Sequence, residues 1–156
     1  MDDASYMRLA IAKAREGIEQ GQTPFGACIV RDGQILACSH NEVWATCDIT
    51  AHAEVQALRE ACAQLKGVDL SGATIYCTCE PCPMCFGAIH WAKIPRIVYG
   101  AGITDAKEFG FNELPISNET MKQEGKSKIQ VESGLLYEES RGLFKLWAAC
   151  EERRVY

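Results

Sequence analysis

The sequence lacks a long hydrophobic run, and it lacks a secretory signal. No window approaches the ~18 consecutive apolar residues that a membrane span requires. The N-terminus carries Asp2 and Asp3 where a signal peptide would place positive charges. These absences predict a cytoplasmic protein with no membrane partner.

Basic residues are also in short supply. The chain has 16 Lys and Arg against 21 Asp and Glu, which gives a formal net charge of −5. Proteins that bind nucleic acid normally carry a basic patch that attracts the phosphate backbone. A nucleic-acid partner is therefore not expected, and the charge balance favours a small, neutral substrate.

Internal repeats, low-complexity tracts and linker-like stretches are missing as well, so residues 1–156 are predicted to form a single domain. The composition, 47% hydrophobic and 24% charged, is typical of a globular core. Nine cysteines are present, an odd number in a chain without a secretory signal. Reduced thiols or metal ligands are therefore expected in place of a disulfide framework.

Apolar spacing predicts helices and strands in alternation. Apolar residues three and four apart mark one face of a first helix, and Asp32-Gly33 supplies the positive φ angles of a tight hairpin turn. The middle of the chain alternates strand and helix, which indicates an α/β fold. In chain order the predicted elements are a helix at 4–19, strands at 25–30 and 34–38, a loop at 40–50, a helix at 51–65 with Thr50 as N-cap, a strand at 73–79, a helix opening with Pro81 and ending near Trp91, a strand at 96–100, a strand at 128–133 and a helix within 135–154.

Four cysteines, Cys77, Cys79, Cys82 and Cys85, lie within nine residues and allow three interpretations: a structural zinc cluster, a redox dithiol or a catalytic metal site. Cys77 and Cys79 fall on the predicted strand and are expected to pack in the core. Cys82 and Cys85 lie three apart in the first turn of a helix, so both thiols face one ion, and the helix N-terminus favours their thiolate forms.

His52 is the best third ligand because it too stands at a predicted helix start. His40 lies in a loop and His90 lies late in its helix, so both are poorer candidates. With three protein ligands, the fourth tetrahedral position on zinc stays open for water. Glu54, two residues after His52, can then carry protons, and this set of residues predicts a hydrolytic site in place of a closed structural one.

His52-Ala53-Glu54 and Pro81-Cys82-Pro83-Met84-Cys85 match the H-x-E…P-C-x-x-C signature of zinc deaminases. The chain resembles the cytidine deaminase-like superfamily over most of its length. The runs CEPCPMCFGAIHWA and TDAKEFGFNE are most similar to the bacterial guanine deaminase branch. The resemblance implies a three-layer α/β/α sandwich around a mixed central sheet, with Zn²⁺ as cofactor.

In that branch the reaction is hydrolytic deamination of a free nucleobase, with guanine to xanthine plus ammonia as the first choice here. Phe25 would pack on the base, Asn41 would hydrogen-bond its polar edge, and Ala53 and Trp91 would complete the pocket.

Two further expectations come from the same resemblance. Glu113 would act as a second acid near the amino group of the base, although an Asp is common at this position. A homodimer is also implied, in which the C-terminal segment crosses to the partner subunit and brings Tyr156 over the partner's pocket.

The alternatives are a transfer RNA adenosine deaminase, a free cytosine or nucleoside deaminase, and a non-catalytic zinc-binding module. The first would need a basic face for the anticodon stem, and the second differs only in substrate. The third predicts bound zinc without release of ammonia, and the presence of Glu54 argues against it.

Overall fold

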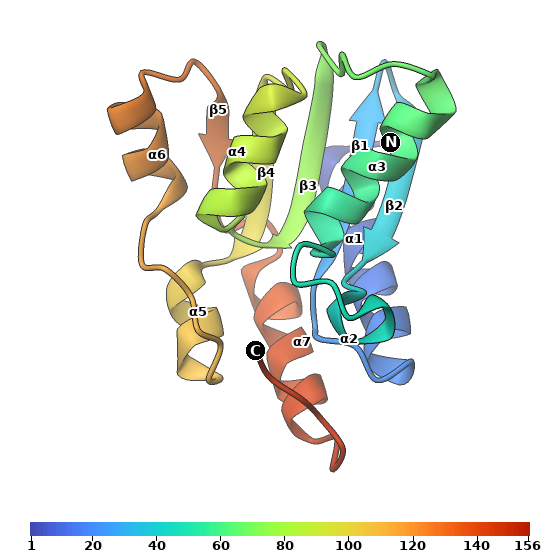
Figure 1. The fold of residues 1–156 in the computed structure, drawn as a ribbon, viewed down its shortest axis with the longest axis vertical. Coiled ribbons are helices and arrows are strands. Elements are labelled where there is room, and N and C mark those ends of the chain that lie inside the picture. The colour runs from blue at the N-terminus through green and yellow to red at the C-terminus, as the bar shows by residue number, and fades with distance from the viewer.

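A computed structural model describes residues 1–156 as a five-stranded mixed sheet with helices on both faces (Figure 1). The strand order is β2-β1-β3-β4-β5, in which β1 is antiparallel to β2 and β3, while β3, β4 and β5 are mutually parallel. The strands are β1 (Gly26–Arg31), β2 (Gln34–His40), β3 (Ala73–Cys79), β4 (Arg96–Ala101) and β5 (Gln130–Glu132).

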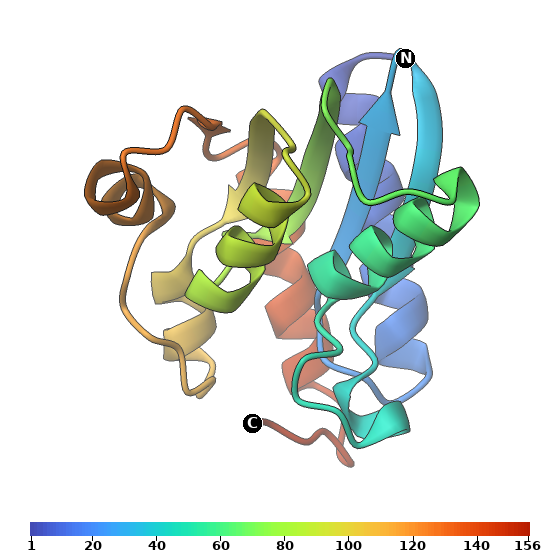
Figure 2. The same ribbon diagram turned by 45° about the horizontal axis from the view of Figure 1, so that its top comes forward.

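The helices complete the three layers that the resemblance predicted. They are α1 (Asp3–Glu19), α2 (Val43–Thr46), α3 (Ala53–Leu65), α4 (Pro83–Trp91), α5 (Ile103–Glu108), α6 (Asn118–Gly125) and α7 (Tyr137–Ala148). Helices α3 and α4 cover one face of the sheet and α1 and α7 cover the other, as Figures 1 and 2 show from two directions. The predicted α/β/α sandwich is confirmed.

The alternation of side chains along each strand separates the two halves of the core. On β1, Ala27 and Ile29 pack with residues of α3 and α4, whereas Cys28 and Val30 pack with residues of α1 and α7. Successive side chains of a strand point to opposite faces of the sheet, so a strand apolar at every position is buried on both sides. This explains why the inner strands read as continuous hydrophobic runs.

The sheet brings three loops to one edge. Because β2 and β3 are both antiparallel to β1, they run in the same direction, and β4 runs parallel to β3. The carboxyl ends of β2, β3 and β4 therefore meet at one edge, which is where open α/β sheets bind their ligands. The C-terminus lies at this same lower edge in Figure 1, near α2 and α5.

Several helix boundaries differ from the sequence-based prediction. The N-cap of α3 is His52, not Thr50, because the Thr50 hydroxyl donates to Asp48 Oδ1 at 2.6 Å. Helix α4 begins at Pro83, not Pro81, and a proline at the first helical position needs no hydrogen-bond partner for its nitrogen.

Other elements were predicted incompletely. The predicted loop at 40–50 contains the short helix α2, and the prediction named neither α5 nor α6. The last helix ends at Ala148, so residues 149–156 form a tail and do not continue the helix to 154. No helix of the structure has both the length and the apolarity needed to cross a bilayer.

Any side chain at Gly26, the first residue of β1, is expected to clash with α1. A Cβ atom there would collide with the carbonyl oxygen of Ala10 and lie 2.9 Å from the nitrogen of Ala14, so α1 would have to move. Gly26→Ala is expected to lower the free energy of unfolding by about 1–3 kcal/mol, which corresponds to roughly 2 to 4 °C in Tm per kcal/mol for a chain of this size.

Gly142→Ala is the matched control, because a Cβ at this position in α7 meets nothing within 4 Å. It should leave Tm unchanged or raise it. Equal thermal denaturation curves for Gly26→Ala and the unmodified protein would contradict the close packing of α1 on β1.

Candidate metal centre

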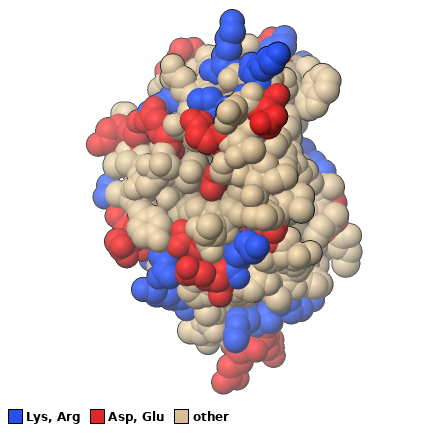
Figure 3. All heavy atoms as spheres, turned by 90° about the vertical axis from the view of Figure 1, so that its left-hand side faces the viewer, with Lys and Arg blue, Asp and Glu red and all other residues tan.

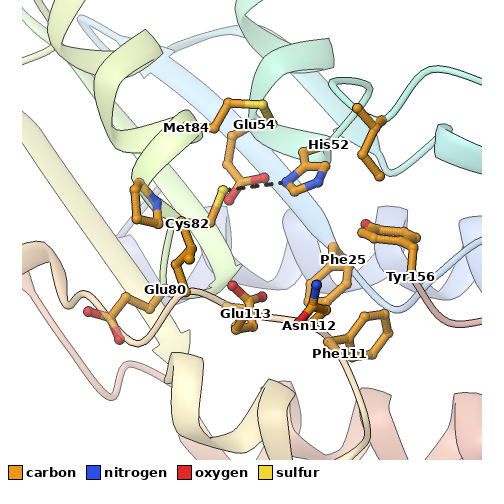
Figure 4. A pocket seen from close by; sticks show the side chains of 14 residues that line it. Phe25, His52, Glu54, Glu80, Cys82, Met84, Phe111, Asn112, Glu113 and Tyr156 are labelled. Carbon is orange, nitrogen blue, oxygen red and sulfur yellow. Dashed lines mark hydrogen bonds between the residues drawn. The ribbon is translucent and has the colours of Figure 1, made fainter.

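Three candidate ligands converge at the edge of the sheet. His52 is the N-cap residue of α3 and Cys82 is the N-cap residue of α4, with Cys85 one turn further on. The Nδ1 atom of His52 lies 3.7 Å from Cys82 Sγ and 3.5 Å from Cys85 Sγ, and the three donor atoms all lie within 4.8 Å of one another. Figure 4 shows Cys82 and His52 directed toward each other.

This donor set fits zinc. A tetrahedral zinc ion with Zn–S near 2.3 Å and Zn–N near 2.0–2.1 Å separates its nitrogen and sulfur ligands by about 3.6 Å, close to the two distances observed. Hydrogen bonds from the Cys85 thiol and with the His52 ring lower the pKa of Cys82 to about 4, which favours the thiolate that a metal requires. The fit supports His52, Cys82 and Cys85 as the residues that would hold the ion.

The other two histidines lie away from the three donor atoms, as predicted, but His40 is the last residue of β2 and not part of a loop. His40 is buried with its Nδ1 atom 2.8 Å from the carbonyl oxygen of Asn41, and His90 is exposed near the far end of α4. Cys77 and Cys79 are buried in the two halves of the core, so the prediction that they are core residues is confirmed.

Glu54 stands in the first turn of α3 beside His52 and Cys82 (Figure 4). Its side chain is buried, and this burial raises the pKa of the carboxyl group to about 7, although the charge on His52 opposes the shift. A carboxyl group with a pKa near neutrality can both accept and release protons at pH 7.

A pocket with a volume of about 270 Å³ opens next to these residues. Phe25, Phe111 and Tyr156 provide aromatic walls, and Glu54 and Glu113 provide carboxyl groups. Burial raises the pKa of Glu113 to about 7, and the nearby charges of Cys82 and Glu54 act in the same direction. The pocket therefore combines apolar surfaces with two carboxyl groups that titrate near neutral pH.

Tyr156, the last residue of the chain, closes one side of this pocket. Its hydroxyl group accepts a hydrogen bond from Asn41 Nδ2 at 2.6 Å, and its backbone carbonyl accepts one from Asn112 N–H at 3.2 Å. Its ring centroid lies 5.6 Å from that of His52 and 5.7 Å from that of Phe111. The tail thus covers the pocket of its own chain, and its exchange between subunits stays a prediction.

Three of the residues expected at the pocket do not line it. Trp91 has a side chain that is 83% exposed and lies at the C-terminal end of α4, about 12 Å along the helix axis from its start. Asn41 is fully buried behind Tyr156, and its Oδ1 atom accepts from the N–H of Val43. Ala53 is fully buried and packs in the core. These three residues therefore do not face the cavity of this single chain, and their contacts with a bound base stay predictions.

Residues that no sequence pattern had marked as pocket residues also line the pocket: Ile49, Glu80, Met84, Phe111, Asn112 and Leu114. Most of them belong to irregular loops, where no periodicity marks the inward face. Glu80 offered one signal, because it is an acid directly between a buried strand and the cysteine pair.

The fold and the site together define a zinc-dependent deaminase domain, a class of hydrolase. Residues 1–101 match the cytidine and deoxycytidylate deaminase zinc-binding region, and the chain belongs to this family.

The similar proteins include enzymes that are named for two different activities. A guanine deaminase of Bacillus subtilis is 45% identical over 123 residues, which cover 78% of this chain and 79% of that protein. A tRNA-specific adenosine deaminase of the same organism is 38% identical over 141 residues, 90% of this chain and 85% of that protein. The solved structure of a guanine deaminase from Nitrosomonas europaea superposes with a TM-score of 0.87 at 30% identity, covering 96% of this chain and 86% of that chain.

Removal of one thiolate tests the ligand set. Cys82→Ala is expected to purify with little zinc, because two remaining ligands do not form a complete tetrahedral site. Zinc content per chain, measured by elemental analysis, checks this. Cys47→Ala is the matched control, since Cys47 is exposed and lies outside the ligand group. Equimolar zinc in Cys82→Ala would contradict the assignment.

Proposed function

We propose that the protein hydrolytically deaminates a free nucleobase, with guanine as the substrate and xanthine plus ammonia as the products. The observation that carries this proposal is the small pocket beside His52, Cys82 and Glu54, which Tyr156 closes. Sites for drug-sized ligands usually have volumes of about 300–1,000 Å³. A pocket of about 270 Å³ therefore suits a single base better than a nucleotide.

The aromatic walls and Glu113 support a guanine substrate. Phe25, Phe111 and Tyr156 offer ring surfaces against which a flat base can pack. In its ionised form Glu113 accepts hydrogen bonds, and guanine presents an amino donor that adenine does not carry at the same position. The similarity to two guanine deaminases adds to this argument.

Zinc, when held by His52, Cys82 and Cys85, would supply Lewis acidity that lowers the pKa of a water molecule towards ~7. Glu54 is placed to accept a proton from a water molecule whose oxygen attacks the ring carbon bearing the amino group. The same carboxyl group then protonates the adjacent ring nitrogen. In a second transfer it takes the proton of the hydroxyl group that the water added to the carbon and delivers it to the amino group, so that ammonia leaves and a carbonyl group remains.

A transfer RNA adenosine deaminase is the second candidate, and the 38% identity over 90% of the chain favours it. Two observations weigh against it. The pocket, with Tyr156 in its lining, has a volume of only about 270 Å³, which leaves little room for the ribose and phosphate groups attached to a base in a polynucleotide. On the face shown in Figure 3, Lys and Arg side chains are interspersed with Asp and Glu, and no continuous basic patch is present.

We also propose that the protein is a cytoplasmic homodimer. All nine cysteines are free, which suits a reducing compartment.

Helix α4 contains no Asp, Glu, Lys or Arg, yet it exposes Met84 and Trp91. Helices that are apolar all round are normally buried, so this outward face suits a second copy of the chain. Sedimentation equilibrium is expected to give twice the mass of one chain, and a monomer at micromolar concentration would contradict the proposal.

Glu54→Gln tests the mechanism. The amide keeps the size of the side chain but cannot exchange protons, so turnover should fall by ~10²–10⁴-fold, the usual contribution of a general acid–base group. Zinc content should stay unchanged, because Glu54 is not among the ligands. Glu60→Gln, an exposed position on the same helix, is the control and should keep full activity. Retention of most activity in Glu54→Gln would show that another group moves the proton.

A substrate panel tests the assignment itself. Ammonia release should be fastest from guanine when it is compared with adenine, cytosine, cytidine and guanosine at equal concentrations. Guanosine should react poorly, because Tyr156 occupies the side of the pocket where a ribose would need space. Transfer RNA, assayed for inosine, should not react. If the protein deaminates transfer RNA but not guanine, the transfer RNA adenosine deaminase assignment replaces the guanine deaminase assignment.

A further inference from the structure

The buried carboxylate of Glu80 connects the two loops that form the site. Glu80 directly follows the last residue of β3, and one residue, Pro81, separates it from Cys82. Its Oε2 atom accepts a hydrogen bond from the N–H of Ile103 at 3.2 Å, and its Oε1 atom accepts one from the N–H of Asn118 at 2.8 Å. We infer that Glu80 is a positioning residue that fixes both ends of the segment carrying Glu113.

The middle of that segment is held by Phe111, which is buried against Phe25 and Trp147, and by Asn112, whose N–H donates to the carbonyl oxygen of Tyr156 at 3.2 Å. Ile103 begins α5 and Asn118 begins α6, and the stretch between these helices brings Glu113 and Leu114 to the pocket. The backbone hydrogen bonds inside the stretch are short-range turns, such as Glu113 N–H to Phe111 C=O at 2.9 Å. Glu113 and Leu114 follow Phe111 and Asn112 outside any helix or strand, so their position also depends on where the ends of the stretch are anchored.

The anchors tie the segment to the loop that carries the cysteines. Asn118 Nδ2 donates to the carbonyl oxygen of Pro81 at 2.6 Å, and the N–H of Glu80 donates to the carbonyl oxygen of Ala101 at 2.8 Å. Glu80 is only 8% exposed and Asn118 is fully buried. Hydrogen bonds to a buried carboxylate are stronger than those between neutral groups, and a lost partner leaves an unsatisfied buried group. Displacement of Glu113 relative to Cys82 is therefore resisted at both ends.

Glu80 does not itself face the reacting groups. Figure 4 shows its carboxylate directed away from His52 and Glu54, whereas the carboxylate of Glu113 lies on their side of the pocket. Both oxygen atoms of Glu80 are engaged by backbone N–H groups. Glu80 thus acts through Glu113, and only this last step rests on the proposed function.

Hydrogen exchange of backbone amides tests the anchoring without any substrate. In Glu80→Gln one carboxylate oxygen becomes an NH₂ group, which faces a backbone N–H donor and cannot accept from it. Amide exchange at Ile103, at Asn118 and through residues 109–117 is expected to accelerate by about tenfold or more, with equimolar zinc retained. Wild-type exchange in this segment would overturn the inference.

Glu108→Gln is the matched control, because Glu108 lies on α5 within the same segment and pairs only with Arg141 at the surface. It should leave exchange through residues 109–117 unchanged. Glu80→Asp keeps the charge but shortens the side chain by one methylene group, and it decides the question if Glu80→Gln does not fold. Faster exchange in the same segment supports the inference, and unchanged exchange overturns it.

Once a base that the protein deaminates has been identified, a double-mutant cycle tests whether Glu80 acts through Glu113. Glu80→Gln and Glu113→Gln should each lower kcat/KM, and the double variant should resemble Glu113→Gln alone, because residues that act as a unit are non-additive. Independent, additive losses would overturn the link. A protein that turns over no base would refute the proposed function and leave the exchange result to decide the anchoring.

Discussion

The site depends on the meeting of two helix N-termini at one edge of the sheet. Strands β2 and β3 are both antiparallel to β1, so the helices that follow them, α3 and α4, begin side by side. Their N-cap residues are His52 and Cys82, and Cys85 follows one turn later. Unpaired N–H groups and the helix dipole at such ends favour thiolates. A change in strand direction would separate the ligands, and no other cluster of His, Cys, Asp or Glu in the chain brings three donors together in this way.

The rest of the pocket is irregular and depends on single side chains. The C-terminal tail is held by hydrogen bonds from Asn41 and Asn112 to Tyr156. The segment that carries Glu113 is held by Glu80. Regular structure therefore places the metal ligands, whereas buried polar contacts between distant parts of the chain shape the space in which a substrate would lie. This division suits a family in which one metal site serves several substrates.

Sequence patterns predicted the regular structure and the metal ligands well, but they predicted the irregular part of the pocket poorly. Periodic apolar residues located α1, the hairpin and the buried strands, and the spacing of Cys82 and Cys85 predicted a shared ion because local helix geometry fixes where both thiols point. The pocket role of Trp91 was implied only by the resemblance, and in this chain Trp91 lies nearly two helical turns beyond Cys85 with an exposed side chain. Asn41, Glu80 and the path of the tail are set by contacts between residues more than 20 positions apart, such as the hydrogen bond from Asn41 to Tyr156. No local pattern encodes such contacts.

X-ray absorption at the zinc edge tests the central claim most directly, because it reports the atoms bound to the ion. Ligation by His52, Cys82 and Cys85 predicts two sulfur atoms near 2.3 Å and two lighter atoms near 2.0–2.1 Å, one from the imidazole and one from solvent. That result would mean an open, hydrolytic centre. Four sulfur atoms would contradict it, since they would require two further cysteines, such as Cys77 and Cys79, to leave the core and would describe a closed structural site.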